Sequence, residues 1–167
     1  MLPSMPARYR RPVGVLSGET AENHQTAVIV AADASCAAYS KMLFGAVKTL
    51  RVLVIEDDAL ITLMLTEVLG DMGHGVCATA ATPTEAIEAA RQHDPDFIIS
   101  DATLRNGSGI AAVEEIQKSK RLPHLFMTGD PMGVRLALPD AVVIRKPFSA
   151  AALFKAIEKA LEASVAS

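Results

Sequence analysis

Short apolar runs in this chain end repeatedly in residues that could do chemistry together. The run Val52–Ile55 ends in carboxylates, and so does Asp96–Asp101, while two later runs end in a hydroxyl and in an ammonium group. The residues at these four ends are Glu56, Asp57, Asp58, Asp101, Thr128 and Lys146. Such a set suits phosphoryl transfer, because positioning and charge neutralisation supply most of that catalysis.

The carboxylates need a cation, because packed carboxylates repel one another and raise one another's pKa. Oxygen ligands of this kind suit Mg²⁺, which is held by one or two carboxylates with water and phosphate oxygens. Lys146 would supply a second positive group to a phosphoryl oxygen, and Thr128 a hydrogen bond. No Cys, Ser or His is placed to attack, so the nucleophile would be a carboxylate. Asp101 is the candidate because it stands alone at the end of the central strand.

Each of these residues, taken alone, has an ordinary structural explanation. Asp58 can be explained as a helix N-cap. Thr128 can be explained as an ordinary strand residue, and Lys146 as a solvated surface charge. The stretch Gly107–Gly109 is typical of a turn. It is the combination, at the ends of successive strands, that favours a functional site.

The segments that must position these residues alternate between strand and helix from Arg51 onward. The predicted strands are Val52–Ile55, Val76–Ala80, Asp96–Asp101, Leu122–Thr128 and Ala141–Arg145. Each strand is followed by a segment with apolar residues at helical spacing, which predicts a helix. These segments run from Ile61 to Met72, from Thr82 to about His93 and from Ile110 to Ile116, with a short one between Thr128 and Asp140 and a last one after Ser149. This alternation predicts an α/β doubly wound fold, a parallel sheet with helices on both faces. In such sheets ligands lie outside the carboxyl ends of the strands.

Two local patterns define helix ends. The stretch Thr82–Glu85 reads Thr-Pro-Thr-Glu, which predicts a capping box with Thr82 as N-cap and proline at the first helical position. Between Thr128 and Asp140, the residues Pro131, Gly133 and Pro139 leave room for barely two turns. The fourth helix is therefore expected to be short.

The strand-end motifs resemble those of the receiver domain of two-component response regulators. They are Val54-Ile55-Glu56-Asp57-Asp58, Ile98-Ile99-Ser100-Asp101, Met127-Thr128-Gly129 and Arg145-Lys146-Pro147-Phe148. The resemblance covers residues 51–163 and places a receiver domain at 49–167. It implies a flavodoxin-like, five-stranded parallel sheet with strand order 2-1-3-4-5.

The resemblance also implies a role for each site residue. Asp101 is similar to the aspartate that accepts a phosphoryl group from a histidine kinase or histidine phosphotransfer protein. Glu56 and Asp57 match the acidic pair that holds Mg²⁺, and Asp101 and the backbone carbonyl of Thr103 complete the protein ligands. In the same pattern, Thr128 and Lys146 are the hydroxyl and the cation that move to the phosphoryl group, and Pro147 follows a cis peptide bond.

The chain departs from the family pattern in the loop after Asp101 and in the fifth strand. Arg105 stands where the family usually has proline, which predicts a different loop orientation. Val143 takes the place of the aromatic switch residue, so the usual swing of a Tyr or Phe cannot operate. The stretch Phe126–Gly129 is similar to an atypical branch marked by Phe-x-Thr-Gly and often served by HWE-type kinases, although Asp130 and Pro131 differ from that branch.

These features predict a stand-alone receiver that signals by contact with a downstream protein and catalyses only its own phosphorylation and dephosphorylation. One alternative is a binding module that keeps the fold without phosphotransfer. Another is a small aspartyl phosphatase, which would need its nucleophile on the first strand. Dinucleotide binding is disfavoured because no glycine-rich turn follows the first strand.

Composition excludes other classes of partner. A net charge of −3 gives no electrostatic case for nucleic-acid binding. The longest stretch without Asp, Glu, Lys or Arg, Met72–Thr84, is shorter than the roughly 20 apolar residues that span a bilayer. Two cysteines cannot build a disulfide framework or a complete structural zinc site. We therefore expect a cytoplasmic protein, monomeric or weakly dimeric, that contacts neither nucleic acid nor membrane.

The first 48 residues differ from the rest, because three early prolines break any helix and no sustained period precedes Ala27. A short strand at Ala27–Ala32 and a loose helix at Ala34–Val47 are the interpretations this segment permits. Met42 lies nine residues before the first clear strand and is an alternative start. Residues 1–48 are thus an N-terminal extension, poorly structured or added by an early start.

Overall fold

A computed structural model describes residues 49–165, in which strands and helices alternate around a parallel sheet. The sheet has five strands in the order β2-β1-β3-β6-β7. These are β1 (Arg51–Ile55), β2 (Gly75–Ala80), β3 (Phe97–Asp101), β6 (His124–Thr128) and β7 (Val143–Arg145). Counted in chain order, the observed arrangement confirms the predicted order 2-1-3-4-5.

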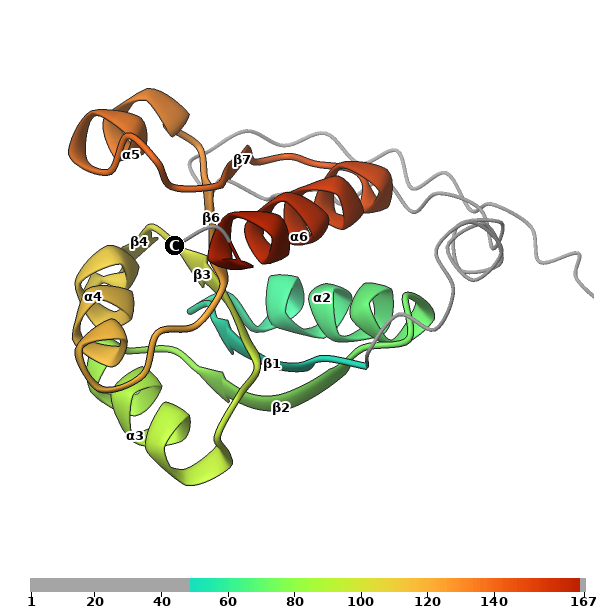
Figure 1. Ribbon diagram of the computed structural model, residues 1–167, viewed down its shortest axis with the longest axis horizontal. Coiled ribbons are helices and arrows are strands. Elements are labelled where there is room, and N and C mark those ends of the chain that lie inside the picture. The colour runs from blue at the N-terminus through green and yellow to red at the C-terminus, as the bar shows by residue number, and fades with distance from the viewer. Residues whose placement is uncertain (1–48, 166–167) are drawn as a thin grey trace, which may run out of the picture.

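Helices cover both faces of the sheet, as predicted (Figure 1). They are α2 (Ala59–Asp71), α3 (Pro83–His93), α4 (Gly109–Ser119), α5 (Pro131–Ala137) and α6 (Ala150–Val165). A two-stranded antiparallel hairpin, β4 (Thr103–Leu104) with β5 (Gly107–Ser108), joins β3 to α4. This hairpin was not predicted, because two-residue strands are too short to show a periodic pattern.

Alternation along the strands divides the core into two layers. Val52 and Val54 of β1 face α2 and α6, where they pack with Leu65 and Leu153. Leu53 and Ile55, which alternate with them along β1, face the opposite layer with α3 and α4. Because both faces of the central strands are buried, β1 and β3 read as continuous apolar runs.

Capping residues start the helices where the sequence predicts. The Asp58 carboxylate accepts hydrogen bonds from the amides of Leu60 and Ile61, and the Ser149 hydroxyl accepts one from the amide of Ala152. Thr82 accepts from the amide of Glu85 at 3.3 Å, which confirms it as the N-cap of α3. The Glu85 carboxylate accepts from the amide of residue 81, one position before the amide that a standard capping box uses.

The observed strand β6 begins at His124, two residues after the start predicted for the strand Leu122–Thr128. Pro123 has no N–H to donate, and the Gln117 side chain binds both backbone groups of Leu122, its amide at 3.0 Å and its carbonyl at 2.7 Å. The predicted strand Ala141–Arg145 likewise starts at Val143.

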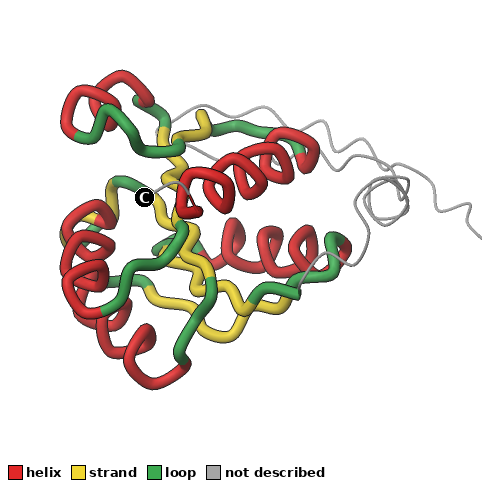
Figure 2. The backbone as a smooth tube through the Cα atoms, in the orientation of Figure 1, coloured by secondary structure: helices red, strands yellow, loops and turns green. Residues whose placement is uncertain are grey.

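Helix α5 is visibly shorter than the other helices of the domain (Figure 2). Its seven residues confirm the predicted truncation of the fourth helix. Within residues 49–165 no helix has the length and apolarity that crossing a membrane requires. The interpretations of Ala27–Ala32, Ala34–Val47 and the alternative start at Met42 lie outside the described residues.

Candidate functional site

Three predicted metal ligands lie together at the carboxyl ends of β1 and the central strand β3. Glu56 and Asp57 follow β1, and Asp101 ends β3, which is the neighbour of β1 in the sheet. One carboxylate oxygen from each lies within 4.8 Å of the other two. An all-oxygen set of this spacing fits the preference of Mg²⁺ for carboxylates, with room left for water and phosphate oxygens.

Lys146 joins two of these carboxylates. Its Nζ atom donates to Glu56 Oε2 and to Asp101 Oδ2, each at 2.7 Å. The residue follows β7, where its backbone amide donates to the Thr128 carbonyl at 2.8 Å, and the Lys146–Pro147 peptide bond is cis, as the resemblance implied. The alternative explanation of Lys146 as a solvated surface charge is wrong, because only 13% of its side chain is exposed.

Burial and charge act in opposite directions on this ion pair. Burial raises the pKa of Glu56, and the hydrogen bond and positive charge of Lys146 partly oppose that shift. For Lys146, burial lowers the pKa, but the hydrogen bonds and the negative charges of Asp101 and Glu56 together outweigh burial and raise it. Lys146 is therefore held as a cation in the centre of the acidic cluster.

Asp101 combines a fixed position with access to solvent. Its Oδ1 accepts from the Thr103 amide at 3.0 Å, its Oδ2 is held by Lys146, and 15% of the side chain is exposed. Helix α4 begins directly against its backbone: a Cβ atom at Gly109 would lie 1.8 Å from the Asp101 carbonyl oxygen. Only glycine permits this approach, so the start of α4 positions the candidate nucleophile.

Thr128 lies next to this cluster but is bound elsewhere. It ends β6, the other neighbour of β3, and the residue is buried. The hydroxyl oxygen accepts a hydrogen bond at 3.0 Å from the amide of Asp130 instead of contacting the carboxylates. Asp130 in turn caps α5 by accepting from the amide of Gly133 at 3.2 Å. The hydroxyl is thus connected to the start of α5.

The structure adds Arg105 to the site, a residue for which the sequence predicted only a change in loop orientation. Arg105 lies in the turn between β4 and β5, and its Nε atom is 3.0 Å from Asp57 Oδ2. Its backbone amide donates to the same oxygen at 3.1 Å. The only signal in the sequence was a basic residue four positions after the candidate nucleophile, and that spacing specifies no partner.

Comparison with known proteins places these residues in a family. A family model for the response regulator receiver domain matches residues 52–158. The chemotaxis protein CheY of Bacillus subtilis is 31% identical over 117 residues, which cover 66% of this chain and 97% of CheY. The phyllosphere-induced regulator PhyR of Methylorubrum extorquens is 36% identical over 117 residues, which cover 66% of this chain and 43% of PhyR.

A solved structure agrees with this assignment. The receiver domain of PhyR from Erythrobacter litoralis, determined by NMR in solution, matches with a TM-score of 0.63 at 35% identity, covering 71% of this chain and 94% of that domain. This chain spans less than half the length of the PhyR from Methylorubrum extorquens. The match runs from β1 into α6 and includes every residue of the acidic cluster, so the chain belongs to the family of response regulator receiver domains.

Proposed function

We propose that this chain accepts a phosphoryl group on Asp101 from a phosphohistidine of a histidine kinase or a phosphotransfer protein, with Mg²⁺ required. The observation that carries the proposal is the pairing of Lys146 with Asp101 and Glu56 beside the third carboxylate, Asp57. A domain selected only for binding would gain nothing from gathering three carboxylates at one edge, because like charges in proximity cost stability.

The residues divide the chemistry among them. A carboxylate oxygen of Asp101 attacks phosphorus, a P–O bond forms, and the P–N bond breaks with its electron pair going to the imidazole. Mg²⁺, held by Glu56, Asp57, Asp101 and the Thr103 carbonyl, would neutralise charge on the phosphoryl oxygens. The Lys146 ammonium is already within 2.7 Å of Asp101 and would pair with one of those oxygens.

Thr128 provides a route from the site to the surface. If its hydroxyl turns to a phosphoryl oxygen, the hydrogen bond with the Asp130 amide is lost, and Asp130 is the cap of α5. No aromatic residue is needed for this route, which suits a domain with Val143 in the fifth strand. Phosphorylation would therefore act first on α5.

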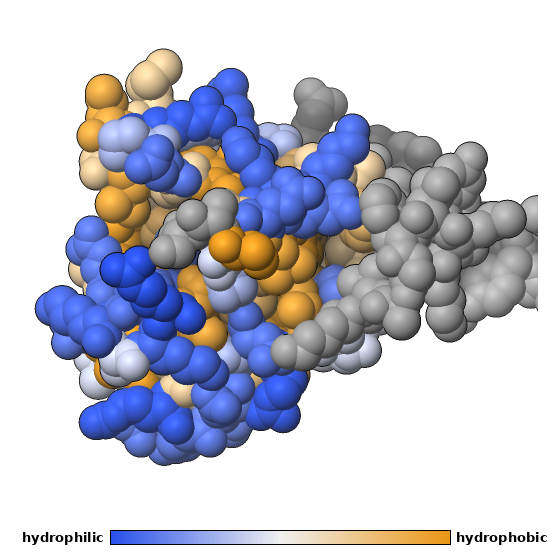
Figure 3. Space-filling view, in the orientation of Figure 1, coloured by the Kyte–Doolittle hydropathy of each residue, from blue (hydrophilic) through white to orange (hydrophobic). Residues whose placement is uncertain are grey.

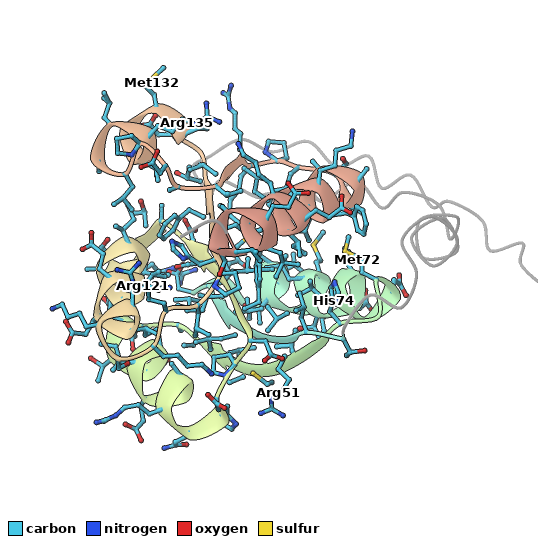
Figure 4. The ribbon with its side chains drawn as sticks, viewed as in Figure 1. Arg51, Met72, His74, Arg121, Met132 and Arg135 are labelled. Atoms are coloured by element: carbon cyan, nitrogen blue, oxygen red, sulfur yellow. The ribbon has the colours of Figure 1, made fainter. Side chains whose placement is uncertain are left out.

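The exposed side of α5 is where a downstream protein would bind. Met132 and Leu136 are 66% and 78% exposed, and apolar residues gather over this helix (Figure 3). Met132 and Arg135 both extend away from the sheet (Figure 4). In this role the chain is a signalling switch that acts on no substrate besides its own phosphoryl group. It would carry out this role in the cytoplasm.

A second candidate is a binding module that works without phosphorylation. Val143 and Arg105 favour it, because both stand where the family pattern has residues associated with switching and with the loop at the site. The two candidates differ in whether α5 responds to occupancy of the acidic site.

Amide NMR with Mg²⁺ and the phosphoryl mimic beryllium fluoride separates them. A phosphoacceptor should show shifted amides around Asp57 and Asp101 and, on addition of the mimic, around Asp130, the N-cap of α5. The Thr128→Ala variant should keep the first set of shifts and lose most of the second. No shift at Asp57 or Asp101 in the wild type would favour the phosphorylation-independent module.

A further inference from the structure

The side chain of Arg105 pairs with Asp57, one of the three carboxylates of the proposed magnesium site. Its guanidinium Nε is 3.0 Å from Oδ2 of Asp57, and its backbone amide donates a hydrogen bond to the same oxygen at 3.1 Å. Asp57 has 14% of its side chain exposed, whereas Arg105 has 75% exposed. An exposed, solvated cation therefore pairs with a mostly buried anion.

The two cations of the site divide its carboxylates between them. Lys146 contacts Glu56 and Asp101, while Arg105 contacts Asp57, so each carboxylate has a cationic partner within 3.0 Å. Three carboxylates against two cations leave one net negative charge. The acidic cluster is thus already largely neutralised by the chain itself. A divalent cation would bring two positive charges to a site with only one net negative charge.

We propose that Arg105 is a built-in counter-ion that competes with Mg²⁺ for Asp57 and so raises the Mg²⁺ concentration at which the site fills. This inference rests on the proposed phosphoacceptor function. The ammonium of Lys146 would stay in place for the phosphoryl group. The guanidinium of Arg105 must move away from Asp57 or remain beside a doubly charged ion.

Exposure makes this competition reversible. An ion pair with a solvated arginine is weak, because the arginine regains water and side-chain freedom when it leaves. The Arg105 amide can keep its hydrogen bond to Asp57 while the side chain swings into solvent, so the loop need not refold. Arg105 therefore sets the affinity for the cation without blocking the site.

The test is a Mg²⁺ titration of the full chain followed by amide chemical shifts, since the sequence has no tryptophan to report on binding. We compare wild type with Arg105→Ala, which removes the guanidinium and keeps the amide. Arg105→Lys keeps the charge. Arg91→Ala removes the same charge from the exposed side of α3, where Arg91 pairs with Glu88.

Arg105→Ala should bind Mg²⁺ about three- to tenfold more tightly than wild type, as expected for loss of one nearby cation in a partly solvated site. Arg105→Lys should stay closer to wild type than Arg105→Ala does, and Arg91→Ala should match wild type. Detectable binding only in Arg105→Ala would also support the inference.

Equal or weaker binding by Arg105→Ala would overturn the inference and leave the proposed function intact, provided that wild type binds Mg²⁺. Equal tightening in Arg91→Ala would overturn it as well, because net charge alone would then explain the effect. If Arg105→Lys matched Arg105→Ala, charge at this position would not be the cause. Binding by none of the proteins would overturn both the inference and the magnesium site.

Discussion

The two edges of the sheet use polar side chains in different ways. At the amino ends of the strands, Asp96 Oδ2 accepts from the Arg51 amide at 3.2 Å, and His74 Nδ1 accepts from the Leu50 amide at 3.4 Å. Arg51 also donates through its side chain to the carbonyl of His93. Arg51 and His74 of this amino-end edge are labelled in Figure 4. These polar side chains satisfy backbone groups.

At the carboxyl ends, polar side chains instead gather with one another. Three carboxylates share a region within 4.8 Å and depend on Lys146 and Arg105 for balance. Structural and functional polar residues therefore differ: the first bind backbone groups that would otherwise be unpaired, while the second gather like charges that only cations or a ligand can balance. Local rules broken in this way mark functional sites.

The largest expected effect on stability comes from closing the contact behind Asp101. Gly109→Ala would place a Cβ atom 1.8 Å from the Asp101 carbonyl oxygen and 2.4 Å from the Ser100 hydroxyl. Because the neighbour is backbone that cannot yield, the free energy of unfolding should fall by about 3 kcal/mol or more. Urea denaturation measures this loss.

Gly70→Ala in α2 is the matched control, since beyond the neighbouring residues and backbone of its own helix no heavy atom lies within 4 Å of its added Cβ. That variant should be about 0.5–1 kcal/mol more stable than wild type, because alanine is the better helix former. A Gly109→Ala protein as stable as wild type would show that α4 does not hold the backbone of Asp101 in place.

Lys146→Ala should have the next largest effect. Removing the ammonium leaves the carboxylates of Glu56 and Asp101 without their cation, and Glu56 is almost fully buried. Without metal we expect a loss of about 1–3 kcal/mol in the free energy of unfolding. The loss should shrink when Mg²⁺ is added, because the ion supplies the missing positive charge.

Chemical denaturation with EDTA or with Mg²⁺ tests this prediction, and Lys118→Ala is the control. Lys118 is an exposed lysine that pairs with Glu115, so its removal should leave the denaturation midpoint unchanged in both buffers. A Lys146→Ala protein that is more stable than wild type without metal would contradict the idea that this lysine balances the cluster.

A smaller effect is expected at the amino-end edge, where burial lowers the pKa of His74. The unfolded chain takes up a proton on this histidine below pH about 6.5, while the folded protein keeps the ring neutral to lower pH. Stability is therefore full above that pH and is lost as pH falls toward the lowered folded pKa.

His74→Gln should flatten this decline, since glutamine can accept from the Leu50 amide but does not titrate. Denaturation midpoints between pH about 7.5 and 5.5 provide the measurement, with His93→Gln as the control at an exposed position. An unchanged slope in His74→Gln would contradict the assignment of this pH dependence to His74.

Much of the fold and the acidic site followed from the sequence because both depend on local patterns. Apolar runs such as Val52–Ile55 and caps such as Asp58 act over a few residues, and the parallel topology brings strand ends to one edge. The adjacency of β1 and β3, which groups Glu56 and Asp57 with Asp101, was implied by the resemblance to receiver domains and not by these local patterns.

Contacts that depend on long side chains or on two-residue elements did not follow from the sequence. The Arg105–Asp57 ion pair joins residues 48 positions apart through an exposed, flexible side chain. The β4–β5 hairpin has no periodicity to detect. The resemblance implied that the Thr128 hydroxyl moves to a phosphoryl group, whereas in the structure the hydroxyl oxygen accepts from the amide of Asp130, a contact that its residue type alone does not specify.

The most direct test of the phosphoacceptor assignment is the intact mass of the protein after incubation with Mg²⁺ and acetyl phosphate. Wild type, Asp101→Asn and Asp96→Asn are compared, so that one aspartate from each edge of the sheet is removed. We predict one added phosphoryl group in wild type and Asp96→Asn and none in Asp101→Asn. Full labelling of Asp101→Asn, or no labelling of wild type, would contradict the assignment.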